Sequence, residues 1–100
     1  MKMKHQLINN EEKKRYEYMI DGHYAFIDYI IARGNIYLTH TEVPRIFAGQ
    51  GIGKELVLDV LTNIKEKTEY DLVPLCPFVA AYIKKNPEWK EIVSDTVNIE

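Results

Sequence analysis

Apolar and polar residues alternate along the first half of the chain, and this spacing changes between Pro44 and Gly49. Alternation is typical of β-strands that bury one face. Beyond this region apolar residues recur every three or four positions, which indicates an amphipathic helix. The pattern predicts a strand-rich first half, followed by a helix, a strand and a second helix.

Four strands are expected in the first half, and they would form an antiparallel meander. Asp21-Gly22 is a strong hairpin signal, and Arg33-Gly34-Asn35 marks a second turn. A third turn is expected at 9–12. The strands are then predicted at residues 5–8, 15–20, 23–32 and 35–43.

Strand alternation also assigns residues to faces. Segment 23–32 is apolar on both faces, so we expect it at the centre of the sheet. In the strand predicted at 35–43, one side is expected to carry Ile36, Leu38, His40 and Glu42.

The second half contains one clear helical stripe, formed by Ile52, Leu56, Val57, Val60, Leu61 and Ile64. It predicts a helix over 51–67, followed by a short buried strand over 70–75. Pro77 is suited to the first position of a second helix, and Asn86-Pro87 would end it. The fold class is therefore α+β, with helices packed against a sheet.

Composition limits the classes of protein to consider. The 100 residues, 46% of them hydrophobic, fit a single domain covering 1–100. A net charge of −2 disfavours a nucleic-acid-binding protein. We expect no membrane span, because the longest apolar stretch is interrupted by Asp28. The basic N-terminal residues precede no apolar core, and the chain has one cysteine, so a reduced, cytoplasmic setting is expected.

The segment Ala48-Gly49-Gln50-Gly51-Ile52-Gly53-Lys54 stands where a strand is expected to end and a helix to begin. Its backbone N–H groups and the helix dipole would suit an anion such as a pyrophosphate, although a simple tight connection has the same pattern. A Rossmann fold does not fit, because antiparallel strands precede the segment. A Walker A loop does not fit either, because Glu55 follows Lys54 where Ser or Thr is required.

Three blocks of sequence resemble the GNAT superfamily of N-acetyltransferases, and more closely its short, single-domain GNAT-like members. They are His40-Thr41-Glu42-Val43-Pro44, Gly49-Gln50-Gly51-Ile52-Gly53-Lys54-Glu55-Leu56-Val57, and Leu75-Cys76-Pro77-Phe78 with Tyr82-Ile83 and Asn86-Pro87-Glu88-Trp89. Together they cover most of residues 15–93. The resemblance implies a GNAT-like fold and an acetyltransferase that carries acetyl from acetyl-CoA to an amine.

The resemblance also implies where acetyl-CoA lies. Its pantetheine arm would pair with the strand that contains Thr41 and Val43. Its pyrophosphate would rest on Gly49, Gln50, Gly51, Ile52, Gly53 and Lys54. Ala48 departs from the superfamily, which usually has Gln or Arg there, so phosphate binding would depend on backbone N–H groups and Lys54. Phe78 and Tyr82 have core-like spacing, but the matching family segment lies beside the thioester.

Cys76 is the first candidate catalytic residue. It precedes Pro77, at the expected start of a helix, where the dipole favours a thiolate. Packing as a small buried hydrophobic residue is the alternative. The short GNAT-like family has a proposed catalytic role for this cysteine, as an acid for the leaving thiolate or as an acyl-carrying nucleophile.

His40 and Glu42 are candidates for the general base, with a sheet histidine and a solvated charge as their structural alternatives. No histidine pairs with Cys76 at a metal-ligand spacing, so no zinc site is expected.

The rival function is a non-catalytic CoA-binding or protein-interaction module. Because superfamily members usually carry helices between their first two strands and this chain has space only for a turn, we expect an open acceptor site suited to a large or protein-borne amine. The sequence gives no indication of oligomeric state.

Overall fold

The computed structural model describes residues 5–99; residues 1–4, which include most of the basic N-terminal segment, and residue 100 lie outside the described residues. Five strands, two α-helices and two short 3₁₀ helices follow one another along residues 5–99. In order they are β1 (Ile8–Asn10), β2 (Arg15–Ile20), β3 (His23–Ala32), β4 (Asn35–Glu42), η1 (Arg45–Phe47), α1 (Ile52–Lys67), β5 (Asp71–Pro74), α2 (Pro77–Lys85) and η2 (Pro87–Ile92).

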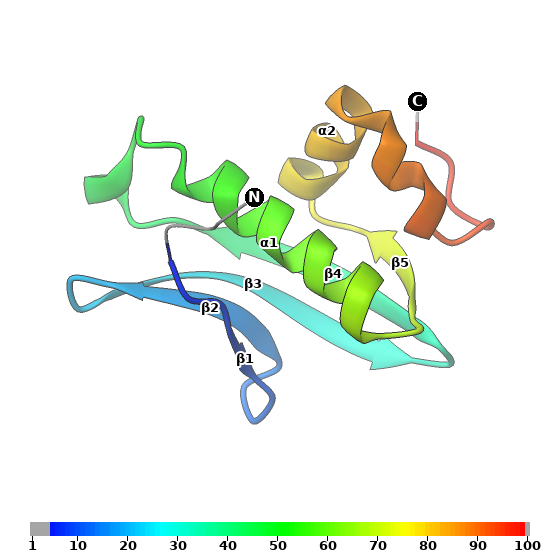
Figure 1. Cartoon of the computed structure of the whole chain (residues 1–100), viewed down its shortest axis with the longest axis horizontal. Coiled ribbons are helices and arrows are strands. Elements are labelled where there is room, and N and C mark those ends of the chain that lie inside the picture. The colour runs from blue at the N-terminus through cyan, green and yellow to red at the C-terminus, as the bar shows by residue number, and fades with distance from the viewer. Residues whose placement is uncertain (1–4, 100) are drawn as a thin grey trace.

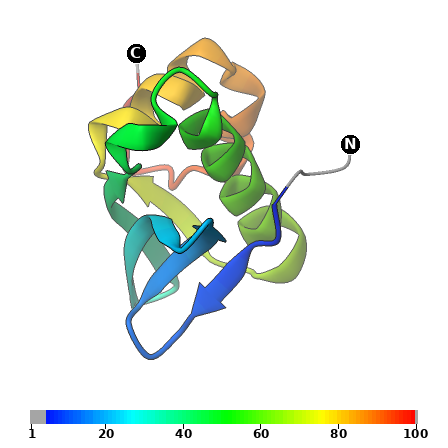
Figure 2. The ribbon, with the colours of Figure 1, turned by 90° about the vertical axis from the view of Figure 1, so that its left-hand side faces the viewer.

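The five strands form one mixed sheet in the order β1-β2-β3-β4-β5. Neighbouring strands from β1 to β4 are antiparallel, and β5 runs parallel to β4 because α1 makes the crossover between them. Figure 1 shows α1 and α2 side by side above the same face of the sheet, and Figure 2 shows this two-layer arrangement from the end. The predicted α+β class and the antiparallel meander are confirmed.

The core lies between this face of the sheet and α1. All six apolar positions of the predicted stripe, from Ile52 to Ile64, are buried, and they pack against Tyr18, Ile27 and Leu38 of the sheet. At roughly 1.5–3 kcal/mol for each large buried side chain, this stripe is the main energetic reason for the helix–sheet packing. The segment 77–85 is helical and buries Val79 and Ile83, so the second predicted helix is confirmed as well. No helix among residues 5–99 is long and apolar enough to cross a membrane.

Two hairpin turns have the backbone that their residues suggest. Asp21 and Gly22 have φ values of 49° and 80°, and Arg33 and Gly34 have values of 53° and 82°. Positive φ at both central residues is the requirement of the turn that matches the twist of antiparallel strands. These turns therefore fix the register of β2, β3 and β4.

The position of β1 was predicted wrongly. It spans Ile8–Asn10 rather than residues 5–8, and the turn lies at 11–14 rather than at 9–12. Asn10 is the last residue of the strand, and its side-chain oxygen accepts a hydrogen bond from the Lys13 N–H (3.1 Å). Asn10 thus stabilises the turn from the strand that precedes it.

The expected face of His40 and Glu42 was also wrong, because β4 contains a β-bulge. Asp28 of β3 pairs with His40, whereas the next residue, Tyr29, pairs with Leu38, so Thr39 is an extra residue. One inserted residue reverses the alternation. His40 and Glu42 therefore lie on the sheet face opposite the helices, away from the buried Leu38.

The sheet face opposite the helices is uncovered in the described chain. Strand β3 is central, as predicted, yet only one of its two apolar faces is buried. On the other face Tyr24 and Ile30 of β3 and Met19 of β2 are each more than half exposed. The approach to His40 and Glu42 from this side is therefore open.

Asp59 of α1 offers a test of the packing between α1 and β2. Its carboxylate accepts a 2.9 Å hydrogen bond from the hydroxyl of Tyr18. Burial raises the pKa of Asp59, the Tyr18 hydrogen bond lowers it, and Glu55 raises it again. Because the net pKa is higher in the folded chain, ionisation of Asp59 costs stability, and this cost disappears as the pH falls through that pKa.

We expect Asp59→Asn to raise the melting temperature by roughly 1–3 °C at pH 7, since an amide oxygen still accepts from Tyr18 but carries no charge. The difference from wild type should narrow as the pH falls toward 4 in thermal melts. Asp59→Ala, which leaves the Tyr18 hydroxyl without this acceptor, should instead destabilise the chain. An Asn variant as unstable as the Ala variant would contradict this explanation.

Candidate active site

Strands β4 and β5 separate to form a fork. Their parallel pairing ends at Leu38 and Pro74, and the Cys76 N–H then donates to the Leu38 carbonyl (2.9 Å) as the chain turns into α2. β4 continues for four more residues and pairs there only with β3. Beyond the fork, the β4 edge that faces away from β3 is free to pair with an extended ligand.

Cys76 stands at the base of this fork. It is 5% exposed and is the N-cap residue of α2, with Pro77 at the first helical position as predicted. Its Sγ lies 3.2 Å from Oγ1 of Thr41 on β4. Because of the bulge, Thr41 points to the helix side of the sheet, where it fixes the cysteine side chain against the strand.

The predicted anion site follows the C-terminal end of β4. After Pro44 the chain makes η1, whose Phe47 is buried, and then the turn that contains Gly49 and Gly51. Both glycines have left-handed φ values, 79° and 76°, which few other residues adopt without strain. The turn therefore places the start of α1 beside the end of β4.

The first helical hydrogen bond of α1 is donated by the Glu55 N–H to the Gly51 carbonyl (3.0 Å). The N–H groups of residues 51–54 precede it and have no acceptor within the helix. The side chains of Gln50 and Lys54 are exposed, whereas that of Ile52 is buried in the core. Ile52 can therefore meet a ligand only through its backbone, while Lys54 can add a positive charge.

Gly53 allows the start of α1 to pack closely against a side chain of α2. A Cβ built there would lie 2.8 Å from Cζ of Phe78 and 3.5 Å from Cγ2 of Val43. The Phe78 ring on α2, 44% exposed, thus lies against the start of α1 and near the end of β4. Tyr82, one turn further along α2, is half-buried and packs against the core. These contacts bring three of the predicted cofactor-binding residues together on the helix side of β4.

His40 and Glu42 form a separate group on the uncovered face. Nε2 of His40 lies 3.1 Å from Oε1 of Glu42, and the two side chains are 57% and 60% exposed. The His40 ring also lies 6.3 Å, centroid to centroid, from Phe26 of β3. Arg15 stacks on Phe26 at 3.7 Å and forms a 3.0 Å ion pair with Asp28, the cross-strand partner of His40.

The predicted catalytic residues therefore lie on two sides of one strand. Cys76 faces the helices with Thr41, and His40 faces the open side with Glu42. Sequence reasoning missed the Thr41 contact, the cluster around Phe26 and the bulge that separates the two groups. The only sequence signal for the bulge is that the apolar alternation of β4 stops at Leu38 and polar residues follow.

Comparison with known proteins identifies the family. A family model described as GCN5-related N-acetyl-transferase matches residues 15–92, which include strands β2 to β5, the glycine turn, both α-helices and η2. A comparison with functionally curated proteins gave no match. The family supports acyl transfer as the general activity. With more than half of its length matched, the chain belongs to the GCN5-related N-acetyltransferase family.

Proposed function

We propose that the protein transfers the acetyl group of acetyl-CoA to a primary amine. The observation that carries this proposal is the fork: a free strand edge runs from Cys76 to a glycine turn, where α1 begins. Membership of the acetyltransferase family supports it.

The parts of the site match the parts of acetyl-CoA. The unpaired N–H groups and positive dipole at the start of α1 suit its pyrophosphate, and Lys54 lies in the same first turn. The free edge of β4 suits the amide-containing pantetheine arm, which can pair as an added strand. This alignment would put the thioester at the fork, next to Cys76 and Thr41. Acetyl-CoA supplies an activated acyl carbonyl with a thiolate leaving group.

The two groups of side chains suit the two proton transfers of the reaction. A carboxylate can only accept, so a neutral His40 that bonds Glu42 carries its proton on Nε2 and leaves Nδ1 free to accept. His40 would take a proton from the ammonium group of the acceptor on the uncovered face. The amine nitrogen then bonds to the acyl carbon, the carbon–sulfur bond breaks, and the nitrogen releases its second proton to water, leaving a neutral amide. Cys76 would donate a proton to the leaving sulfur on the helix side and would regain one from water.

The acceptor that fits best is a large or protein-borne amine. His40 lies on a sheet face that no described element covers, beside Phe26 and Asp28. An open face admits an amine attached to a bulky body. We therefore propose lysine side chains or N-terminal amines of polypeptides as the acceptor class.

Calorimetric titration with CoA and with free pantetheine tests cofactor recognition. We expect CoA to bind at least 10-fold more tightly, because pantetheine lacks the pyrophosphate that the start of α1 would bind. No binding of CoA would exclude both the enzyme and a CoA-binding module. Tight CoA binding without turnover of any amine would favour the non-catalytic module.

Gly53→Ala tests the contact between α1 and Phe78. The added methyl group must displace the Phe78 ring, which is the movable end of a side chain, so the fold should survive. Alanine also favours helix by about 1 kcal/mol over glycine, so the melting temperature should not fall. We expect the affinity for CoA to weaken roughly 5- to 10-fold, measured by calorimetry, because a ring pushed along the β4 edge obstructs the arm.

The matched control is the Gly53→Ala, Phe78→Leu double variant, in which a smaller side chain leaves room for the methyl group. Recovery of CoA affinity would assign the loss to the ring. A persistent loss would place the methyl group against the ligand itself. Unchanged affinity in the single variant would contradict this placement of the arm.

A further inference from the structure

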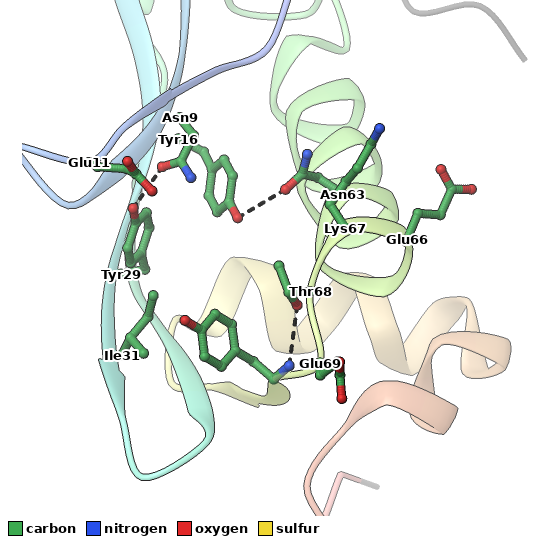
Figure 3. A pocket seen from close by; sticks show the side chains of 11 residues that line it. Asn9, Glu11, Tyr16, Tyr29, Ile31, Asn63, Glu66, Lys67, Thr68 and Glu69 are labelled. Atoms are coloured by element: carbon green, nitrogen blue, oxygen red, sulfur yellow. Dashed lines mark hydrogen bonds between the residues drawn. The ribbon is translucent and has the colours of Figure 1, made fainter.

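A cavity of about 810 Å³ lies at the C-terminal end of α1, between that helix and the sheet. Figure 3 shows Asn9, Glu11 and Tyr29 gathered on the sheet side, with Asn63 of α1 facing Tyr16. Tyr70, just after α1, also lines the cavity. Neither the family match nor the proposed reaction gives this cavity a role. It is separated from the glycine turn by the full α1 helix of 16 residues, about 24 Å long.

Two buried tyrosine hydroxyls give the cavity a defined chemical preference. Tyr16 donates its hydroxyl proton to Oδ1 of Asn63 (3.1 Å), and Tyr29 donates to Oδ1 of Asn9 (2.7 Å). The two residues are only 2% and 3% exposed. Since each hydroxyl has used its single proton, its oxygen can only accept from a ligand. The floor therefore suits a hydrogen-bond donor.

The electrostatic environment favours a cation. Glu11, Glu66 and Glu69 line the cavity, against one basic side chain, Lys67. The negative end of the α1 dipole is directed to the same region. Burial, then Tyr29, Tyr70 and Glu11, raises the pKa of Tyr16 to about 12. The tyrosines thus stay protonated and neutral, and the carboxylates supply the negative charge.

The lining fits an organic cation better than a metal ion. Within residues 5–99 no group of three or more His, Cys, Asp or Glu side chains is arranged to hold a metal. The half-buried Tyr70 instead offers an aromatic surface, and Ile31, which is 41% exposed, adds an aliphatic wall. Such surfaces suit the methylene groups and the charged head of an alkylammonium ion.

We propose that this cavity binds a small aliphatic ammonium ion, with the oxygens of Tyr16, Tyr29 and Glu11 as its acceptors. Its site is distinct from the fork at Cys76, so binding depends neither on CoA nor on acetyl transfer. A diamine or polyamine of the cell carries this chemistry, and putrescine is the probe that represents it.

Amide-detected NMR titration of the full chain with putrescine tests the proposal, with 1,4-butanediol as the neutral analogue of the same length. We expect saturable shifts at residues of the cavity, including the side-chain amides of Asn9 and Asn63. The diol should cause none of them. Equal responses to putrescine and the diol, or no response to putrescine at 10 mM (about 2.7 kcal/mol of binding at 1 M standard state), would overturn the proposal. The same shifts produced by potassium chloride at equal ionic strength would also overturn it.

Three variants test whether putrescine binds in this cavity. Glu11→Gln removes one charge from an exposed turn, and Tyr29→Phe removes one acceptor, so each should weaken putrescine binding about 5- to 10-fold. Glu12→Gln makes the same charge change one residue away, outside the lining, and should leave the affinity within about twofold. An equal effect of Glu11→Gln and Glu12→Gln would show non-specific attraction and would overturn the assignment. Because Glu11 is exposed, its variant remains informative if Tyr29→Phe fails to fold.

Discussion

Replacement of Cys76 by alanine is expected to lower kcat for acetyl transfer by roughly 10²- to 10³-fold, the usual contribution of one general acid. The thiol lies at the base of the fork, 3.2 Å from the Thr41 hydroxyl, where the leaving sulfur would depart. Affinity for CoA should change by less than about threefold, because the glycine turn and the β4 edge are untouched. Steady-state kinetics together with calorimetry measure both quantities.

Two control variants separate chemistry from packing at this position. Cys76→Ser keeps a hydroxyl near Thr41 but is a weaker acid, so its kcat should also be low. Thr41→Val keeps the volume and removes the contact to Sγ; a loss of only several-fold is expected from a positioning residue. Full activity in Cys76→Ala would contradict the acid role. An acetyl adduct on Cys76, seen by intact mass, would instead assign it as a nucleophile.

The second large loss of activity is expected when His40 is replaced. His40→Gln retains a hydrogen-bond donor for Glu42 but cannot accept a proton, so kcat/KM should fall by roughly 10²-fold. The side chain is 57% exposed, so the melting temperature should remain within about 2 °C of wild type.

Glu42→Gln is the matched variant for the same pair. It preserves the shape of the side chain and removes the charge that orients His40, so a smaller loss, about 5- to 20-fold, is expected. A wild-type kcat/KM in His40→Gln would show that another group is the base. Equal losses in both variants would show that the pair acts as a unit.

The sequence predicted most of the fold because its strongest signals are local. The Asp21-Gly22 and Arg33-Gly34 turns and the stripe on α1 depend on residues close together in the chain. Strand β1 was misplaced because asparagine was interpreted as a turn residue, whereas Asn10 ends the strand and binds the turn through its side chain. Such a role becomes visible only when its partner, the Lys13 N–H, is in place.

The candidate site was predicted as a set of residues, but its arrangement was not. The three sequence blocks indicated Cys76, His40 and the glycine turn without saying which face of β4 each would occupy. The bulge at Thr39 decides this, and it depends on how β3 and β4 pair across space. Alternation alone assigns His40 to the wrong side, because a single extra residue reverses every position after it.

The proposed reaction moves an acetyl group from CoA to an amine. The most direct measurement follows acetyl-CoA labelled with ¹³C at the carbonyl by NMR, in the presence of the protein and a peptide that carries both a lysine and a free N-terminus. We predict that the thioester signal is replaced by an amide signal with wild-type protein, at a rate that falls sharply with Cys76→Ala and with His40→Gln. A thioester that persists, or that yields only acetate, would contradict the claim.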